Sequence, residues 1–426
     1  MTPRRRFLKT TALAALGLAS SKGPRCWGGT NTPSVVIVGG GFGGLNAALA
    51  LRALLPAARI TVIDSNPTPL HCPGSNAVIA GLAPMGAITA SADRLLEAKG
   101  IRQILGTVSA VDAHRKRLTL ETGAALPYDR LIVATGIGFR WDALEGYNAA
   151  LSQRFPHAWQ AGPQTELLRR QIAALPAGGV VLITAPVAPY RCPPGPYERA
   201  SLIAHRLSRD NPRAKIIVLD AKSRFPKETA FKAAWARLYP GRIEWISLDT
   251  EGPLDHLDAR NQTLVTAFGR FKADVLNLIP DQKASPLAER LGLTDTSGWC
   301  PVFPANFESR TMKDVHVIGD AAALGPLPKS AFAAQNEARH CALAVALSLN
   351  GQPAPDPELI NHCYSLVAPD QAISVTGRYR LNTSRTGFET RLLAESGPSD
   401  DPRAEALETR DWLRLLYHST FGNPNL

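Results

Sequence analysis

The chain has 426 residues, of which 45% are hydrophobic and 19% are charged. This composition excludes an intrinsically disordered chain, and the length predicts two or three domains. The formal charge is +11, but residues 1–29 carry six basic residues and no acidic one, so +11 minus 6 leaves only +5 for the rest. Because no Lys- or Arg-rich stripe follows, no nucleic-acid partner is expected.

Residues 1–29 have the order of an export signal. Arg4-Arg5-Arg6-Phe7-Leu8-Lys9 precedes a short apolar run from Ala12 to Ala19, and small residues follow. The pair Arg4-Arg5 with Phe7-Leu8-Lys9 resembles the bacterial twin-arginine signal, which exports folded proteins. The alternative is a basic, disordered terminus. No later stretch is long and apolar enough for a transmembrane helix, so we expect a periplasmic protein.

The next segment predicts a dinucleotide-binding fold. The β-branched run Ser34 to Val38 predicts a buried parallel strand. It leads into a glycine-rich turn, a helix from Leu45 to Leu55 and a second strand from Arg59 to Ile63. In the G-x-G-x-x-G pattern, the glycines allow a tight turn, close approach to a pyrophosphate and helix-on-strand packing, and an acid some 20 residues on binds a ribose. The residues that fit these roles are Gly39, Gly41, Gly44 and Asp64.

Two later segments favour a flavin over a free nicotinamide cofactor. The segment from Tyr128 to Gly136 resembles the strand and turn that close the first FAD segment of flavoproteins with two dinucleotide domains. The segment from Val315 to Asp320 resembles their late strand, whose acid meets the ribityl or phosphate end of FAD. By this resemblance the cofactor-binding residues also include Thr135, Gly136, Gly319 and Asp320.

A second nucleotide site is expected to be lost. The strand from Gly179 to Thr184 and the strand from Lys215 to Leu219, which ends at Asp220, predict a second nucleotide-like domain. The first of these strands runs into the loop 185–196, which holds five prolines where a glycine fingerprint belongs. Proline has no backbone N–H to offer a phosphate. NADH is therefore not expected to reduce the flavin.

The six cysteines exclude several chemistries. No C-x-x-C motif occurs, so neither a thioredoxin-like motif nor a haem attachment is expected in this chain, and no zinc-type spacing is present. Cys300, beside Trp299, and Cys341, in a helix from Phe332 to Leu347, are expected to be buried. Cys192 lies in the proline-rich loop, where Arg191 and Arg199 are candidates for an electropositive setting.

The chain resembles the flavoprotein subunit of flavocytochrome c sulfide dehydrogenase over essentially its whole length, most weakly between Thr376 and Arg410. The matching stretches are Arg191-Cys192-Pro193-Pro194-Gly195-Pro196-Tyr197-Glu198-Arg199-Ala200-Ser201, Gly298-Trp299-Cys300-Pro301-Val302, His316 to Ala321, Pro328-Lys329-Ser330, Cys363-Tyr364-Ser365 and Thr420-Phe421-Gly422. The resemblance implies a redox disulfide between Cys192 and Cys363 over the flavin. The alternative is an inert structural disulfide, which is common in exported proteins.

The same resemblance implies further site residues. A cysteine matching Cys72 carries the flavin covalently, although Pro73 and Gly74 depart from the usual pattern; the alternative is a buried free thiol. Lys329 is expected near the reduced flavin's negative edge, or simply at a helix start. Trp412 is expected to pack near the flavin, or in the core. Independently of the resemblance, Glu198 is expected to accept a proton near Cys192, or to form a salt bridge with Arg199 or a neighbouring residue.

We therefore predict an α/β protein with two Rossmann-like domains, as in glutathione reductase. An FAD domain at 30–145 and 282–352 is split by a nested domain at 146–281, and a C-terminal α+β domain covers the flavin from 353 to 426. The predicted activity is oxidation of hydrosulfide to sulfane sulfur, with electrons passed through FAD to a separate c-type cytochrome subunit. The alternatives are a sulfide:quinone oxidoreductase and a non-catalytic flavin electron-transfer protein whose disulfide is structural.

Overall fold

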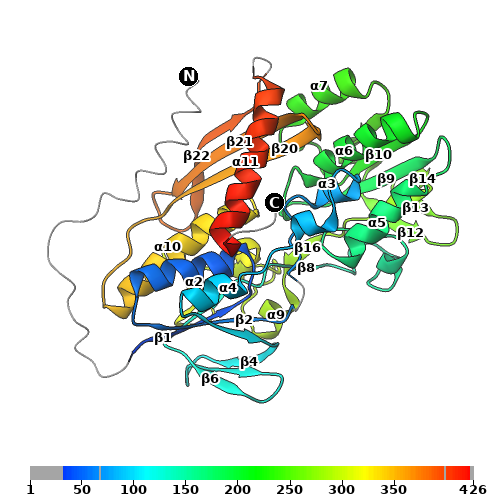
Figure 1. Ribbon diagram of the computed structural model, residues 1–426. Helices are drawn as coiled ribbons and strands as arrows, with labels where there is room; N and C mark the ends of the chain where they lie inside the picture. The colour runs from blue at the N-terminus through cyan, green and yellow to red at the C-terminus, as the bar shows by residue number, and fades with distance from the viewer. Residues whose placement is uncertain (1–31, 67–68, 398–399, 423–426) are drawn as a thin grey trace. The chain divides into compact units, whose positions relative to one another are not determined.

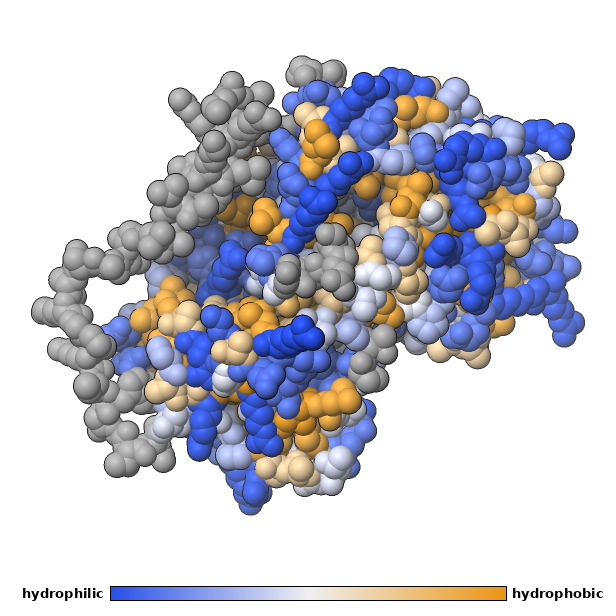
Figure 2. Space-filling view, viewed as in Figure 1, coloured by the Kyte–Doolittle hydropathy of each residue, from blue (hydrophilic) through white to orange (hydrophobic). Residues whose placement is uncertain are grey.

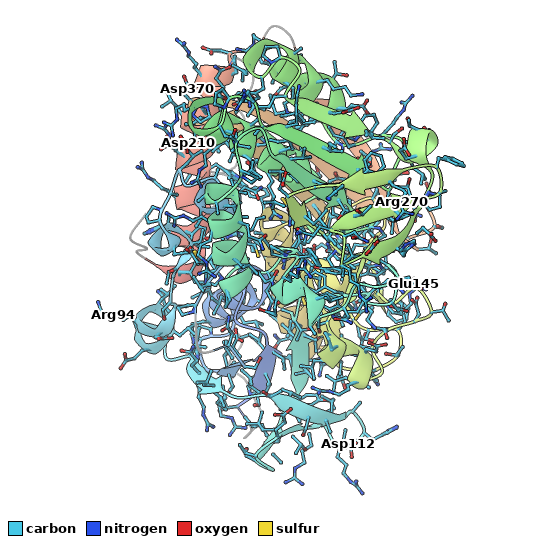
Figure 3. The ribbon with its side chains drawn as sticks, turned by 90° about the vertical axis from the view of Figure 1, so that its right-hand side faces the viewer. Arg94, Asp112, Glu145, Asp210, Arg270 and Asp370 are labelled. Atoms are coloured by element: carbon cyan, nitrogen blue, oxygen red, sulfur yellow. The ribbon has the colours of Figure 1, made fainter. Side chains whose placement is uncertain are left out.

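The computed structural model describes residues 32–66, 69–397 and 400–422. The predicted export signal lies outside these residues, as does Cys26. Residues from Pro33 onward form one compact unit. Within the described residues, no helix combines the length and apolar character needed to cross a membrane. Charged side chains such as Arg94, Arg270 and Asp370 lie at the outer surface (Figure 3).

The first layer is a parallel five-stranded sheet in the order β18-β7-β1-β2-β3. Its central strand is buried because the run Val35–Val38 is apolar on both faces. Helices α2 and α10 pack against each other on this sheet (Figure 1). The elements are β1 (Ser34–Val38), α2 (Phe42–Leu54), β2 (Arg59–Asp64), β3 (Arg102–Leu105), β7 (Arg130–Val133), β18 (Val315–Val317) and α10 (Ala331–Leu349).

The second layer is a parallel four-stranded sheet in the order β11-β10-β9-β15. Its helices α5, α6 and α7 bury apolar faces in a hydrophobic cluster of their own. Together the two parallel sheets confirm the predicted pair of Rossmann-like folds. The elements are α5 (Pro163–Ala173), β9 (Val180–Ala185), α6 (Gly195–Asp210), β10 (Lys215–Asp220), α7 (Glu228–Leu238), β11 (Ile243–Ile246) and β15 (Val275–Asn277).

The C-terminal part is a long antiparallel sheet, β20-β21-β22, with helix α11 packed on it. The strands are β20 (Glu358–Ala368), β21 (Gln371–Leu381) and β22 (Phe388–Glu395), and α11 spans Pro402–Phe421. Asp401 caps α11 by accepting hydrogen bonds from the N–H groups of Arg403 and Ala404. The far end of α11 reaches α2, where Asn46 donates a hydrogen bond to Thr420 (Figure 1).

Small elements complete the fold. Two antiparallel three-stranded sheets and several short helices and bridges connect the main layers. They are α3 (Ser75–Ile79), a 3₁₀ turn (Met85–Ile88), α4 (Asp93–Ala98), β4 (Val108–Asp112), β5 (Arg117–Leu120), β6 (Ala125–Pro127), β8 (Ile137–Phe139), a 3₁₀ turn (Leu151–Gln153), α8 (Leu248–Glu251), β12 (Leu254–Asp258), β13 (Thr263–Thr266), β14 (Arg270–Lys272), β16 (Gln282–Ala284), α9 (Pro286–Arg290), β17 (Cys300–Pro301), a 3₁₀ turn (Gly319–Ala321) and β19 (Ala322–Ala323).

Both parallel sheets have a switch point at their first strand. The chain continues from β1 to one neighbour, β2, and returns on the other side as β7; in the second sheet β9 lies between β10 and β15 in the same way. In open α/β sheets, ligands bind at the carboxyl ends of strands at such points. The glycine turn 39–44 follows β1 and the proline loop follows β9, so both loops stand where ligands are bound.

Candidate active site

One large cavity, about 640 Å³ in volume, lies where the two parallel layers and the C-terminal sheet meet. Of the predicted site residues, it is lined by Gly39, Gly41, Asp64, Cys72, Thr135, Gly136, Cys192, Gly319, Asp320, Cys363 and Trp412. Residues from all three predicted domains therefore meet at one cavity. Lys329 and Gly44 are not part of its lining.

The glycine turn has the geometry that a pyrophosphate needs. A Cβ at Gly39, whose φ is +109°, would lie 2.4 Å from the carbonyl oxygen of Ala134, and a Cβ at Gly44 would lie 1.9 Å from that of Gly39. Nothing lies within 4 Å of a Cβ at Gly41, which faces open space in the cavity. Because no side chain caps α2, its first N–H groups are left for an anion.

Two buried polar atoms on the cavity wall lack a protein partner. Oδ1 of Asp320 and Nε1 of Trp412 make no hydrogen bond. Burial raises the pKa of the Asp320 carboxyl. Unpaired buried polar groups are costly, so these two atoms point to a ligand that offers a hydroxyl donor and an acceptor. A flavin dinucleotide has ribityl hydroxyls for the first and ring carbonyls for the second, so the lining fits FAD.

The other side chains carried over from flavoproteins lie at the same wall. Asp64 ends β2 and accepts a hydrogen bond from the N–H of Gly40 at 2.7 Å. The Thr135 hydroxyl accepts one from Ser285 at 2.7 Å. Gly136 and Gly319 have φ of +68° and +72°, a region that favours glycine. These residues would hold the adenosine and ribityl parts of the cofactor.

Lys329 is turned away from the cavity. Its Nζ donates hydrogen bonds to the carbonyl oxygens of Asp320 and Ala322, at 2.8 and 2.9 Å, and lies 3.8 Å from the centre of the Trp299 ring. Burial lowers the pKa of Lys329 to about 8. The lysine thus holds together the loop that carries Asp320, while the following residue, Ser330, caps α10 through the N–H of Ala333.

Cys192 has a strained backbone and a crowded environment. Its φ is +54°, which is uncommon outside glycine, and such strain clusters at functional sites. Its N–H donates to the carbonyl oxygen of Lys329 at 2.8 Å. A Cβ at Gly195 would lie 2.6 Å from the Trp159 ring and 3.1 Å from Sγ of Cys192, so only glycine leaves this sulfur its position.

Cys363, on β20, lines the same cavity. Cys192 and Cys363 are both free thiols in this structure, and each is partly exposed. Burial raises the pKa of both thiols, and the Cys363 thiolate charge raises that of Cys192 further. Arginine was expected to lower the pKa of Cys192, and Arg191 does so, but burial raises this pKa by more. The positive charge that acts on both sulfurs is Lys227, a residue that no sequence motif places here.

Glu198 faces the two cysteines with both oxygens occupied. They accept hydrogen bonds from Asn76 Nδ2 at 2.7 Å and from the N–H of Leu366 at 2.9 Å. Burial raises the pKa of the Glu198 carboxyl. The negative charge of Glu198 in turn raises the pKa of the Cys192 and Cys363 thiols. No ion pair to Arg199 forms among the described residues, so the predicted Glu198–Arg199 pairing is not present.

Arg199 instead organises the cavity wall. Its guanidinium is 1% exposed and donates to the carbonyl oxygens of His157 and Ala158 and to the side chains of Asn76 and Asn277. It also stacks over the Trp159 ring at 4.8 Å. Burial lowers the pKa of Arg199 to about 9. This one side chain ties α6 to the segment 157–159 and to the loop of Cys72.

Cys72 also lies close to Trp159 and is among the groups whose negative charge acts on Arg199. Its Sγ is 3.9 Å from the Trp159 carbonyl oxygen, and it lines the cavity as a free thiol. Tyr417 of α11 donates a hydrogen bond to the carbonyl oxygen of Pro73 at 2.8 Å, which fixes the loop that departs from the family pattern. By contrast, Cys300 and Cys341 are fully buried, as expected, and neither lines the cavity.

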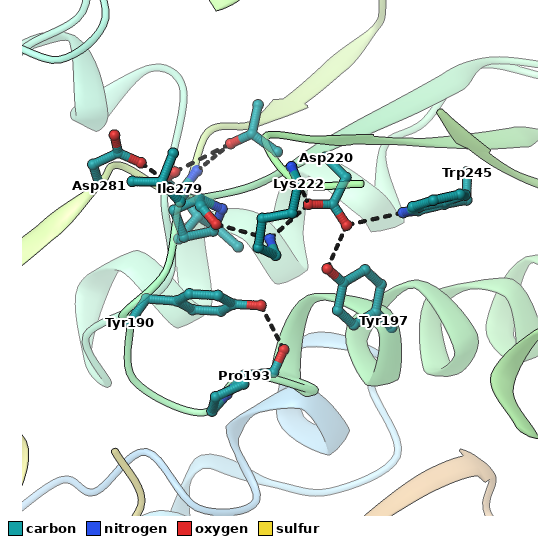
Figure 4. Close-up of polar contacts among 11 residues, drawn as sticks. Tyr190, Pro193, Tyr197, Asp220, Lys222, Trp245, Ile279 and Asp281 are labelled. Carbon is teal, nitrogen blue, oxygen red and sulfur yellow. Dashed lines mark hydrogen bonds and ion pairs between the residues drawn. The ribbon is translucent and has the colours of Figure 1, made fainter. Parts of the chain in front are cut away.

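The acid that would bind the ribose of a second nucleotide is already engaged by protein side chains (Figure 4). Asp220, at the end of β10, accepts hydrogen bonds from Tyr197, Trp245 and Lys222, at 2.5, 2.9 and 2.6 Å. Tyr190 of the proline loop donates to the carbonyl oxygen of Pro193 at 2.6 Å. The backbone N–H of Lys222 is a fourth donor, at 3.1 Å, so this carboxylate has little capacity left for a ribose. In the described part of the chain, no group of metal-ligating side chains gathers either.

The fold and the cavity define an FAD-dependent oxidoreductase of the pyridine nucleotide-disulphide oxidoreductase class, whose family model matches residues 33–163. Two further models match the central and C-terminal parts of the chain. "Sulfide dehydrogenase [flavocytochrome c] flavoprotein chain, central" matches residues 165–280, and "Flavocytochrome c sulphide dehydrogenase, flavin-binding" matches residues 355–421. The chain belongs to the family of flavocytochrome c sulfide dehydrogenase flavoprotein chains, and its cofactor is FAD.

Similar proteins of other families share parts of the chain or its fold. The type II NADH:quinone oxidoreductase NdhA of Mycobacterium tuberculosis is 38% identical over 121 residues, which are 28% of this chain and 25% of the relative. The mitochondrial sulfide:quinone oxidoreductase of Mus musculus is 21% identical over 72% of this chain and 69% of its own. The solved sulfide:quinone oxidoreductase of Aquifex aeolicus covers 93% of both chains at a TM-score of 0.74 and 17% identity, which shows a shared fold.

Proposed function

We propose that this flavoprotein oxidises hydrosulfide through a redox disulfide between Cys192 and Cys363. The observation that carries the proposal is the presence of both thiols in one cavity with the FAD-binding residues. In addition, Asp220, the acid that would bind a second ribose, already accepts hydrogen bonds from Tyr197 and Trp245. Because this carboxylate has little capacity left for a ribose and the proline loop offers few N–H groups to a phosphate, the electrons need another source. A small sulfur nucleophile that attacks a disulfide is such a source.

The sulfur exchange balances on the two cysteines, and a two-electron acceptor is needed only to re-form their bond. Hydrosulfide attacks one sulfur of the bridge, a new S–S bond forms, the Cys192–Cys363 bond breaks, and the other cysteine leaves as a thiolate. A second hydrosulfide removes the sulfane sulfur as polysulfide and leaves the dithiol. Closing the bridge again releases two electrons and two protons. FAD, when bound, supplies the two-electron acceptor for this step and can release the electrons singly.

The cavity residues have defined parts in this cycle. Glu198, whose pKa is raised, is placed to take up a proton near Cys192 and to return it to solvent. Asn76 and the N–H of Leu366 orient its carboxyl. The strained turn at Cys192 and the glycine at 195 hold the sulfur in place without a covering side chain.

The test is an anaerobic titration of the flavin-loaded protein with sulfide. We expect the flavin absorbance to bleach in the wild type and in Cys300→Ala, whose thiol lies outside the cavity, but not in Cys192→Ser or Cys363→Ser. Equal bleaching in Cys192→Ser would refute the disulfide's role. No bleaching in the wild type would support a non-catalytic electron-transfer protein instead.

We propose a separate c-type cytochrome subunit as the electron acceptor, in keeping with the family. We also propose export to the periplasm by the twin-arginine signal.

A quinone is the second candidate for the electron acceptor, because Leu407 and Leu415 of α11 are 62% and 66% exposed and offer an apolar contact outside the sheet. Figure 2 shows apolar residues interspersed among hydrophilic ones on the face it displays. Reduction rates with cytochrome c and with decylubiquinone distinguish the two acceptors, and co-purification of a haem subunit supports the first.

We also propose that Cys72 carries FAD through a thioether. Its sulfur lines the cavity, and the loop 71–74 is fixed by Tyr417. After denaturation, the yellow colour should stay with the wild-type polypeptide and leave Cys72→Ala. Complete release of flavin from the wild type would refute the linkage without affecting the sulfide chemistry.

A further inference from the structure

The side chain of Lys227 is buried beside the two cysteines and has no anionic partner at contact distance. The lysine precedes α7 with a φ of +60°, and it is 1% exposed. Its Nζ donates hydrogen bonds to Ser365 Oγ at 2.7 Å and, more weakly, to the carbonyl oxygen of Ile373 at 3.4 Å. Among the described residues, it forms no ion pair.

A buried ammonium without an anion is expensive, so its surroundings indicate what it is kept for. The groups whose negative charges act on it are Cys363 and Cys192, Glu198 of α6 and Glu395 of β22. The oxygens of Glu198 accept from Asn76 and Leu366, and Oε1 of Glu395 accepts the backbone N–H of Lys227 itself at 3.0 Å. Of these groups, Cys363 acts most strongly on the lysine. Its thiol donates a long hydrogen bond to the carbonyl oxygen of Tyr364 at 3.4 Å, which the thiolate form would release.

Ser365 connects the lysine to this cysteine. Cys363 and Ser365 are two positions apart on β20, so their side chains share one face of the strand. The Ser365 hydroxyl holds the ammonium on that face of β20, where its charge acts on the sulfur of Cys363. Cys192 has a different environment, because it comes from the proline loop, where the Cys363 thiolate and Glu198 both disfavour its negative charge.

We propose that Lys227, held by Ser365, is a positioning residue that provides the buried counter-charge of the Cys363 thiolate. The inference rests on the proposed function and assigns the order of the first step. Hydrosulfide forms its bond to Sγ of Cys192, the bond between the two cysteines breaks, and the electron pair stays on Sγ of Cys363. The products are a persulfide on Cys192 and a thiolate on Cys363 that faces the lysine, with the total charge unchanged.

The electrostatics of the two sulfurs agree with this assignment. Burial raises the pKa of Cys363, and Lys227 is the charge that acts most strongly against that rise. Burial also raises the pKa of Cys192. There, the negative charges of Cys363 and Glu198 each raise the pKa by more than the positive charge of Lys227 lowers it. Lys227 itself has its pKa lowered by burial and raised again by these thiolates and carboxylates. The charge on Lys227 and the thiolate on Cys363 therefore stabilise each other.

The test follows the two thiols separately in the reduced, flavin-loaded protein. Each sample is treated with methyl methanethiosulfonate at pH 6 to 9, and the labelling rates of the peptides with Cys192 and Cys363 are measured by mass spectrometry. The variants are Lys227→Met, which removes the charge, and Lys227→Arg, which keeps it. Lys232→Met, on an exposed side chain of the same helix, is the matched control.

We expect Cys363 to react faster than Cys192 in the wild type at pH 7. Lys227→Met should lower the Cys363 rate by about tenfold, the effect of one pKa unit on the thiolate fraction, and shift its pH profile upward. Cys192 should change much less, while Lys227→Arg and Lys232→Met should keep the wild-type order. If Lys227 were only structural, its replacement would change the labelling rates of Cys192 and Cys363 in the same direction and by similar factors.

Two outcomes separate this inference from the proposed function. If the oxidised protein contains the Cys192–Cys363 crosslink and Lys227→Met leaves the Cys363 profile unchanged, the inference fails and the proposed function stands. If no crosslink forms at all, both fail. Should Lys227→Met not fold, Ser365→Ala keeps the lysine and removes the connecting hydroxyl; it must show the same selective slowing of Cys363, and equal rates in this variant and the wild type would overturn the inference.

Discussion

Replacing Arg199 by methionine should destabilise the protein measurably, because this guanidinium holds the cavity wall together. The variant keeps an apolar stem of similar length and removes four hydrogen bonds, at 3.0, 3.0, 2.8 and 2.6 Å. The carbonyl oxygen of His157 keeps a donor, Asn277 Nδ2 at 2.9 Å. The carbonyl oxygen of Ala158 and the amide oxygens of Asn76 and Asn277 lose theirs.

The magnitude follows from these three acceptors. Each buried acceptor left without a donor costs about 1–3 kcal/mol, and removing a desolvated cation offsets part of the sum, so we expect a net loss of about 3 kcal/mol. The assay is urea unfolding of the flavin-loaded protein, followed by fluorescence. Arg169→Met, which breaks an exposed pair with Glu166 at 3.7 Å, is the control and should change stability by less than about 0.5 kcal/mol. A free energy of unfolding for Arg199→Met equal to that of the control would refute the role given to this arginine.

Two further predictions concern the turn and the buried acid. Gly44→Ala places a Cβ 1.9 Å from the carbonyl oxygen of Gly39, so it should abolish flavin loading, measured by flavin absorbance. Gly86→Ala, whose Cβ would have nothing within 4 Å, is the control and should load flavin normally. Normal loading of both variants would contradict the packing argument. The pKa of Glu198 is higher in the folded protein than in the unfolded chain. Its contribution to the free energy of unfolding is therefore full at pH values below its pKa in the unfolded chain, and it is lost as the pH rises through its pKa in the folded protein. The stability advantage of the wild type over Glu198→Gln, measured by urea unfolding, should therefore narrow from pH 5 to pH 8, and an advantage that widens would show the opposite shift.

Local patterns predicted the parts of the fold whose geometry is set by neighbouring residues. The run Val35–Val38, the glycines after it and Asp64 lie where the sequence places them, because a strand, a turn and a helix start depend on short-range sterics. The five prolines after β9 likewise predicted the loss of a phosphate cradle. The saturation of Asp220 by Tyr197 and Trp245 needed the tertiary structure.

The residues that sequence reasoning missed or misplaced depend on long-range contacts. Lys227 reaches Ser365 across 138 positions of sequence, and no motif surrounds it. Its left-handed backbone before α7 leaves no signal, since lysine has no preference for that conformation. Lys329 was expected near the flavin, and its Nζ donates to the loop of Asp320. Arg199 was expected to supply positive charge near Cys192, with which it does interact, but its hydrogen bonds go to carbonyl and amide oxygens. In each case the direction of a long side chain was decided by partners remote in sequence.

The most direct measurement of the central claim is a non-reducing peptide map of the oxidised, flavin-loaded protein, taken before and after one equivalent of sulfide. The account predicts a crosslinked pair of peptides that contain Cys192 and Cys363 beforehand. Afterwards it predicts a separated pair in which the Cys192 peptide carries one additional sulfur atom. Two unlinked cysteines in the oxidised protein, or a crosslink that sulfide leaves intact, would contradict it.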